Sequence, residues 1–522
     1  MVRAVSLVSG LTMTSRILGV VREQAFAALF GAGGHADAFV VAFRIPNLLR
    51  DLFAEGALSA AFVPTYAAAL AEGGRRRADE LAGRVVALLL LAMSVLLLAG
   101  FLGSDWIVAR LAPGFGEVPG KSSLAAFLTR VMLPFLPLVS LAAVAMGMLN
   151  AERRYGPPAF APATFNIVTI AVAFALWQLG WSPDQLVLGW SLGVILGGVA
   201  QLGIQLPALR GQGFRLRPSL ARDPGVGRIL RLMLPATVGM AAVQINIFVN
   251  TYFASFQDGA LTWLQLAFRV VHLPIGVFGV AIGTIAAAGL ARRAAAGDMS
   301  GLQSTLVDGL RLLAFLTIPA SVGAIVLREP IVRLLFERGA FGPEDTAATA
   351  TALALYALGL VGYTGVKVVV PAFYALDKPR VPLLGSSAAV AANLVVVLAL
   401  HRSFGFGAIA LGTALGSLVN CALLVAAFER RWGGLRGQGI SRSLLKMVAA
   451  TIPMGALAWL SELWLSRWLG TAGVVAGLAT CFGPILLSIV AYGAVAALLR
   501  LREVTLLLGL LRRGTRPAGE AG

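Results

Sequence analysis

Long apolar segments follow one another along most of the chain, and they constrain its fold more than any other feature of the sequence. An α-helix needs about 20 residues to cross the hydrocarbon core of a bilayer, and these segments reach that length. Charged residues make up 13% of the 522 residues, where soluble proteins have about 25%. A membrane β-barrel would show short alternating segments instead. The sequence therefore predicts an all-α polytopic membrane protein.

Turn-forming breaks such as GAGGHAD, GWSPD and QDG divide the apolar sequence into fourteen predicted spans. The loops after even-numbered spans, among them EGGRRRADELAGR and ARRAAAGD, are basic, whereas these three odd-numbered breaks hold no Lys or Arg. The positive-inside rule then places both termini in the cytoplasm. The spans lie near residues 5–30, 36–70, 83–110, 122–150, 158–180, 184–208, 227–255, 258–290, 303–327, 347–376, 380–400, 407–430, 443–468 and 471–500.

Two segments six spans apart resemble each other, VVAFRIPNLL at 40–49 and QLAFRVVHLP at 265–274. An even separation gives both copies the same orientation in the membrane, which predicts two six-helix lobes related as a parallel pseudo-repeat. The expected organisation is an N-terminal lobe, a C-terminal lobe, two further C-terminal spans and a basic cytoplasmic tail, at residues 1–210, 227–430, 443–500 and 501–522 respectively.

Charged residues interrupt the second span, DAFVVAFRIPNLLRDLFAEGALSAAFVP. On an ideal helix the side chains of Arg44, Asn47, Asp51 and Glu55 form one stripe. Each charge facing lipid at this depth costs at least ~2.5 kcal/mol, so the stripe must face protein or a water-filled cavity. Pairing of arginines with acids to hold helices together is an alternative explanation that the sequence leaves open.

The sign of these intramembrane charges favours an anionic ligand. The first two spans and Arg269 supply five arginines, against the four acids Glu23, Asp37, Asp51 and Glu55. A guanidinium binds phosphate in a bidentate manner and stays ionised when it is desolvated, whereas Lys acts as a point charge. A phosphate or diphosphate group is therefore the expected ligand, ahead of a carboxylate.

Three segments resemble the MurJ/MviN family of lipid II flippases, within the multidrug/oligosaccharidyl-lipid/polysaccharide exporter superfamily. They are SRILGVVRE, the second span quoted above and FRVVHLPIGVFGVAIGT, and the resemblance extends over essentially the whole chain. It implies binding of an undecaprenyl-diphosphate-linked headgroup in a central cavity, and a groove for the lipid tail at the last two spans. The family's cavity residues match Arg16, Arg22, Arg50, Arg269, Asp37 and Glu55 here.

Some positions depart from the pattern we expect of the family. Phe268 stands where many relatives carry an acid, His272 where we expect Glu or Gln, and Asn250 where similar proteins often carry Asp. If that Asp binds a coupling cation in relatives, these departures leave open whether a cation drives transport here. The resemblance also leaves open a cell-wall synthesis complex as a partner.

Other classes of function find little support in the sequence. The run GFGEVPGKSS is similar to a phosphate-binding loop, but Phe115 replaces the first required Gly. Three dispersed histidines and two cysteines within apolar segments predict no metal site, and no catalytic residues or cofactor are expected. The formal charge of +18 is explained by basic cytoplasmic loops rather than by nucleic acid.

The expected function is export of lipid II from the inner to the outer leaflet of the cytoplasmic membrane. Alternating access, driven by the membrane potential or an ion gradient, is the expected mechanism. The alternatives are a related exporter of another polyprenyl-linked glycan or of drugs, and a scaffold for envelope assembly that transports nothing. An exporter of organic cations should have an acidic cavity, which the arginines argue against.

Overall fold

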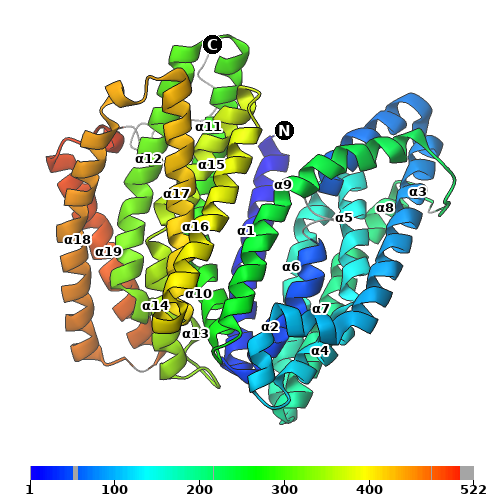
Figure 1. Cartoon of the computed structure of the whole chain (residues 1–522), viewed down its shortest axis with the longest axis horizontal. Coiled ribbons are helices and arrows are strands. Elements are labelled where there is room, and N and C mark those ends of the chain that lie inside the picture. The colour runs from blue at the N-terminus through cyan, green and yellow to red at the C-terminus, as the bar shows by residue number, and fades with distance from the viewer. Residues whose placement is uncertain (1, 51–56, 216, 472, 506–522) are drawn as a thin grey trace. The chain divides into compact units, whose positions relative to one another are not determined.

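The computed structural model describes residues 2–50, 57–215, 217–471 and 473–505, and the regular structure within these ranges is helical throughout (Figure 1). Ten helices or continuous helical stretches in these ranges are long and apolar enough to cross a membrane. A pair bent by 41°, α14 and α15, makes an eleventh if it is one span. The predicted all-α membrane fold is therefore confirmed. The count of fourteen spans stays a prediction.

The chain divides into two compact units. Unit 1 comprises Met1–Thr262 together with Arg338–Gly342, and unit 2 comprises Trp263–Glu337 and Pro343–Gly522. The helices of unit 1 are α1 (Val2–Phe30), α2 (Gly34–Arg50), α3 (Ala57–Leu111), η2 (Pro113–Glu117), α4 (Lys121–Met132), α5 (Phe135–Ala151), α6 (Gly156–Leu179), α7 (Pro183–Gly203), α8 (Leu206–Gly211) and α9 (Pro224–Ala254).

One bend in unit 1 explains why helix boundaries and predicted spans differ. Helix α3 includes parts of two predicted spans, 36–70 and 83–110, and it is interrupted at Gly74, whose φ is 63°. This left-handed conformation favours glycine because a side chain would clash with the backbone there. The two arms of α3 are therefore separate helical segments, which Figure 1 shows as two arms that meet at an end of the unit.

Helices of unit 1 pack in pairs around apolar cores. Helix α1 lies along α6, α6 along α7, and the two arms of α3 lie against α5 and α9. A core cluster between α3 and α5 buries Phe62, Tyr66, Met148 and Leu149 almost completely. Since lipid tails are as apolar as these side chains, close packing rather than exclusion of water holds such helices together within the membrane.

Unit 2 contains most of α10 (Ala260–Pro274), whose first three residues belong to unit 1. Its other helices are η3 (Ile275–Gly279), α11 (Val280–Ala295), α12 (Met299–Val326), α13 (Arg328–Phe336), α14 (Pro343–Ala357), α15 (Leu360–Ala375), α16 (Arg380–Phe404), α17 (Phe406–Trp432), η4 (Arg436–Gln438), α18 (Ile440–Leu469) and α19 (Val474–Leu498).

Small residues set the distance between α15 and α17. A Cβ atom added to Gly362 would lie 2.6 Å from the carbonyl carbon of Ser417, and one added to Gly359 would lie 2.7 Å from the Cα of Ala414. A Cβ added to Gly365, one turn further along, would lie 2.5 Å from the Sγ of Cys421. The two backbones can approach this closely only because one side of the contact lacks side chains.

Helices α10 and α11 are joined by a single wide turn, η3. The N–H of Val280 donates to the carbonyl of Ile275, five residues earlier, which is the spacing of a π-helix. Pro274 immediately precedes the turn and lacks an N–H to donate. The segment HLPIGVFG therefore changes the spacing of the backbone hydrogen bonds over one turn without ending the helix.

The predicted lobes at residues 1–210 and 227–430 stay a prediction. Helix α9, which we assigned to the C-terminal lobe, falls in unit 1 because it packs along α3. Compact units are defined by packing, whereas lobes are defined by how they move, so the two divisions need not agree. Of the predicted tail, residues 506–522 lie outside the described part of the chain.

Candidate functional site

Two of the predicted binding residues lie on α1. Arg22 is half-buried and forms an ion pair with its neighbour Glu23, with 2.6 Å between Nη2 and Oε1. The guanidinium of Arg22 also lies 5.3 Å from the centre of the Phe165 ring on α6, within the range of a cation–π interaction. Arg22 is therefore anchored to the interior of unit 1.

Arg16 lies about one and a half turns earlier on α1, and its side chain is exposed. The backbone beside it is fixed to α6, because the side-chain amide of Asn166 donates to the carbonyl of Ser15 over 3.0 Å. Close contact continues one turn later, where a Cβ added to Gly19 would lie 3.7 Å from the same amide nitrogen. The structure thus presents the Arg16 guanidinium on a helix that is held in place.

Asp37, in the first turn of α2, is fully buried. Its Oδ2 accepts hydrogen bonds from the Nζ of Lys121 at 3.0 Å and from the N–H of Gly259 at 2.8 Å. Its Oδ1 accepts from the N–H of Thr262 at 3.0 Å and from the hydroxyl of Thr262 at 2.8 Å. Four donors satisfy this carboxylate, so in this structure Asp37 links α2 to α4 and to the start of α10.

Lys121 is a partner of Asp37 that the sequence did not indicate. Its ammonium group is almost completely buried, and it bridges Asp37 to Asp258 at 2.5 Å. The same ammonium lies 4.3 Å from the centre of the Phe115 ring, in the segment that resembled a phosphate-binding loop. The GKS of that segment therefore lies at the start of α4, and its lysine binds carboxylates of unit 1.

Arg44 and Asn47, the first two members of the predicted polar stripe, are half-buried on α2. The Nη1 of Arg44 donates to the hydroxyl of Thr251 on α9, and this hydroxyl donates to the carbonyl of Ile247 over 2.6 Å. Thr251 is a second partner that the sequence did not indicate. At Arg44 the stripe therefore faces protein, which is one of the two surroundings that the sequence predicts for it, the other being a water-filled cavity.

The structure describes the remaining predicted residues only in part. The backbone of Arg50 ends α2, but its side chain lies outside the described part of the structure, as do Asp51 and Glu55 altogether. Arg269 is exposed on α10, in unit 2. The structure therefore relates Asp37, Arg44 and their partners within unit 1, and the joint participation of Arg16, Arg22, Arg50 and Arg269 in one site stays a prediction.

Phe268 and His272, which depart from the pattern expected of the family, belong to an aromatic cluster at α10. The ring of Phe268 lies 4.6 Å from His272, 5.0 Å from Tyr356 and 5.8 Å from Tyr363, measured between ring centres. An acid at position 268 would have to be buried partly among these rings. Asn250, on α9, is half-buried. Among the described residues, no group of three or more His, Cys, Asp or Glu side chains is arranged to hold a metal ion.

Comparison with known proteins identifies the family. The family model described as "Lipid II flippase MurJ" matches residues 26–478. The chain belongs to the lipid II flippase MurJ family. A probable lipid II flippase MurJ of Rhizobium meliloti (strain 1021) is 37% identical over 509 residues, covering 95% of this chain and 93% of that protein. One from Vibrio cholerae is 34% identical over 513 residues, covering 95% of each.

Solved structures support the same fold. A structure described as "Lipid II flippase MurJ, inward closed conformation" has a TM-score of 0.78 at 24% identity, covering 94% of this chain and 98% of that one. An inward-facing multidrug transporter of the MATE family, in the MOP superfamily, has a TM-score of 0.65 at 14% identity and covers 83% of this chain and 99% of its own. The resemblance to the MurJ/MviN family is confirmed, and the family is one of flippases, not of enzymes.

The last two helices, to which the family resemblance assigns a lipid-tail groove, carry many exposed apolar side chains. They include Leu445, Ile452 and Trp468 on α18 and Val475 and Val490 on α19, each at least 70% exposed in the isolated chain. Lipid is the natural environment of such surfaces in a membrane protein. A groove for the substrate's tail at these helices stays a prediction.

Proposed function

We propose that this chain moves lipid II, the undecaprenyl-diphosphate-linked peptidoglycan precursor, from the inner to the outer leaflet of the cytoplasmic membrane. Membership of the lipid II flippase MurJ family is the observation that carries this proposal. The residues themselves support it, since Arg16 presents an exposed guanidinium group on an apolar helix. An exposed charge on such a helix is costly unless it meets water or an anionic ligand.

The proposed binding residues are Arg16, Arg22, Arg50 and Arg269 for the diphosphate, with Asp37, Arg44, Asn47 and Glu55 as further polar groups. Arginine suits this role because its planar group makes two parallel hydrogen bonds to phosphate oxygens. In the conformation described, Asp37 and Arg44 are engaged with Lys121 and Thr251. We therefore assign the first contact with the headgroup to Arg16, whose side chain is exposed, and contacts with Asp37 to a later conformation.

Alternating access between the two lobes is the proposed mechanism. The headgroup enters from the cytoplasmic side, the lipid tail stays in the bilayer, and movement of the lobes exposes the headgroup outside. An inside-negative membrane potential assists this step, because moving two negative charges outward across 100 mV releases about 4.6 kcal/mol. Both termini are cytoplasmic in this proposal, since the basic loops follow even-numbered spans. A coupling cation and a cell-wall synthesis complex stay open as partners.

The proposal is tested by expressing the chain in cells depleted of their own lipid II flippase. A membrane-impermeant reagent that labels amines, added to intact spheroplasts, should label lipid II in cells that express the chain and not in depleted cells. Lysed cells give the total lipid II for comparison. If the chain is present in the membrane at normal levels and labelling does not rise, transport of lipid II is excluded. Export of another polyprenyl-linked glycan would then be the remaining candidate.

A further inference from the structure

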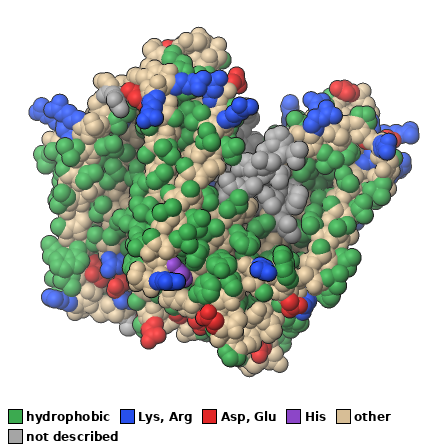
Figure 2. Space-filling model, viewed as in Figure 1, with side chains coloured by type: hydrophobic (Ala, Val, Ile, Leu, Met, Phe, Trp, Pro, Cys, Tyr) green, Lys and Arg blue, Asp and Glu red, His purple; other side chains and the backbone are tan. Residues whose placement is uncertain are grey.

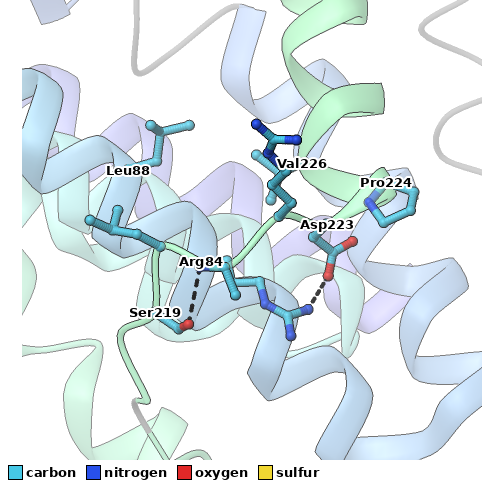
Figure 3. Close-up of a pocket in the computed structure, with 9 residues that line it drawn as sticks. Arg84, Leu88, Ser219, Asp223, Pro224 and Val226 are labelled. Carbon is cyan, nitrogen blue, oxygen red and sulfur yellow. Dashed lines mark hydrogen bonds and ion pairs between the residues drawn. The ribbon is translucent and has the colours of Figure 1, made fainter.

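Unit 1 contains a cavity of about 480 Å³ whose lining includes none of the predicted transport residues (Figure 3). It is formed by the second arm of α3, the linker that precedes α9 and the first turn of α9. Its lining residues are Arg84, Leu88, Ser219, Leu220, Ala221, Arg222, Asp223, Pro224 and Val226. By the positive-inside rule this linker is cytoplasmic, because it follows the sixth predicted span.

The walls of the cavity are held firmly by the fold. Asp223 caps α9 by accepting from the N–H of Gly225 at 2.7 Å, and it forms two hydrogen bonds with Arg77 at 2.7 and 3.0 Å. Figure 3 shows the guanidinium of Arg84 directed at the same carboxylate, with which it forms an ion pair. The linker lies directly on α3, because a Cβ added to Gly83 would collide with the carbonyl of Arg217.

The cavity and its rim carry an excess of positive charge. Four arginines, Arg76, Arg77, Arg84 and Arg222, stand against the two acids Glu80 and Asp223. Arg222 is exposed and makes no ion pair with the described residues. In addition, the Nε of Arg84 is buried and finds no acceptor among them. A buried N–H without an acceptor is costly, so this group favours an anionic ligand that supplies one.

Leu88, which lines the cavity, is followed on α3 by a row of exposed apolar side chains. Arg84 immediately precedes the apolar run of the third predicted span and therefore lies at the membrane surface. At 100° per residue, one face of α3 carries Arg84 followed by Leu88, Leu91, Val95, Leu98 and Leu102, all within about 40° of the direction of Arg84. The last four of these side chains are 51% to 73% exposed.

The distribution of side-chain types over unit 1 agrees with this arrangement. Figure 2 shows Lys and Arg side chains gathered over the end of the unit where the arms of α3 meet, and hydrophobic side chains over the flank along α3. A soluble anion would use only the charged part of such a site. A membrane phospholipid would use both parts, with its phosphate at the arginines and an acyl chain along the apolar face.

We propose that this cavity binds the headgroup of an anionic glycerophospholipid of the cytoplasmic leaflet, with its phosphate at Arg84 and Arg222 and an acyl chain along Leu88, Leu91 and Val95. Asp223 is a positioning residue, because it holds Arg84 and Arg77 at the mouth of the cavity. The site is separate from the proposed transport path and does not depend on lipid II being the substrate.

The test uses the full chain, delipidated in detergent and titrated with palmitoyl-oleoyl-phosphatidylglycerol, with bound lipid measured by native mass spectrometry. Each basic side chain near an anionic membrane surface strengthens binding about fivefold. Arg84→Gln combined with Arg222→Gln should therefore weaken binding by roughly 30-fold. Arg222→Gln alone, at an exposed side chain outside any ion pair described, should weaken it about fivefold without a change in the unfolding temperature.

A matched control removes two exposed arginines from other basic loops, Arg292→Gln with Arg380→Gln, and should bind phosphatidylglycerol as the unaltered chain does. Arg16→Ala with Arg269→Ala should also bind it normally, since these residues belong to the proposed transport path. Equal losses in the control pair and the cavity pair would overturn the proposal. So would equal binding of phosphatidylcholine, or displacement of the lipid by millimolar inorganic phosphate, which would indicate a site for a soluble anion.

Discussion

Asp37 and Lys121 form an ion pair that is buried on both sides, with 3.0 Å between Oδ2 and Nζ and side-chain exposures of 0% and 2%. The pair joins the first turn of α2 to the first turn of α4. Removing both charges from water is costly, and the cost is offset only when hydrogen bonds satisfy both groups. Here Gly259, Thr262 and Asp258 supply those bonds.

Lys121→Met should destabilise the protein strongly, by about 3–5 kcal/mol, because it leaves the carboxylate of Asp37 buried without its cation. The double variant Asp37→Asn with Lys121→Met should lose less, since no charge is then left without a partner. Unfolding midpoints of the purified proteins in detergent give the comparison. A single variant as stable as the unaltered chain would show that water reaches Asp37 in solution.

Arg16→Ala and Arg269→Ala should each abolish surface exposure of lipid II in flippase-depleted cells while protein levels stay normal. The physical reason is loss of a guanidinium that we propose to bind the diphosphate. Arg16→Lys and Arg269→Lys should restore only part of the activity, because an ammonium group lacks the planar pair of donors. Full activity in both alanine variants would reject their assignment as binding residues.

Gly362→Ala should destabilise unit 2 by about 1–3 kcal/mol, because the new Cβ would lie 2.6 Å from the backbone of α17 and force the helices apart. Gly323→Ala is the matched control. It places a methyl group on α12 where no atom lies within 4 Å, and helix propensity then favours alanine by about 1 kcal/mol. Thermal unfolding should therefore shift in opposite directions for the two variants.

Asp223 makes the stability of the folded protein depend on pH. Burial alone would raise the pKa of Asp223, but hydrogen bonds from Arg77, the N–H of Gly225 and Arg84 outweigh burial and hold this pKa below its ordinary value. A lowered pKa in the folded state stabilises the protein above the unfolded-state pKa of about 3.9, and this stabilisation is lost as the pH falls through the folded-state pKa.

The comparison with Asp223→Asn isolates this effect, because asparagine caps a helix equally well but carries no charge. The unaltered chain should unfold at a higher temperature than the variant at pH 7, and the difference should shrink as the carboxylate becomes protonated in acid. A difference that persists unchanged in acid would mean that the charge of Asp223 is not what stabilises the start of α9.

The helices were predictable from sequence because the length and apolarity of a membrane span are local properties. The charged positions on α1, α2 and α10 were predictable for the same reason, since any charge in an apolar segment stands out. The pairing of Asp37 with Lys121 was not, because the two residues are 84 positions apart and no periodicity relates them. Lys121 also lies after a loop whose composition resembles that of many exposed loops.

Local patterns also do not distinguish arginines that pair within the protein from an arginine that is exposed. Arg22 and Arg44 both have partners within unit 1, whereas Arg16 is exposed, yet all three are arginines in apolar helices. The difference lies in which neighbouring helix carries a ring or a hydroxyl at the same depth, Phe165 on α6 for Arg22 and Thr251 on α9 for Arg44. Such a relationship is set by tertiary packing, which the sequence of one helix does not contain.

The π-turn at Ile275–Gly279 offsets the side-chain directions of α10 from those of α11. It holds one residue more than the surrounding α-helical turns, and a residue corresponds to about 100° around the helix axis. When such a turn passes along a helix, the residues that it traverses swivel by that angle while the ends of the helix keep their partners. Arg269 lies six residues before Ile275, so passage of the turn across it would re-aim this guanidinium without unwinding the segment.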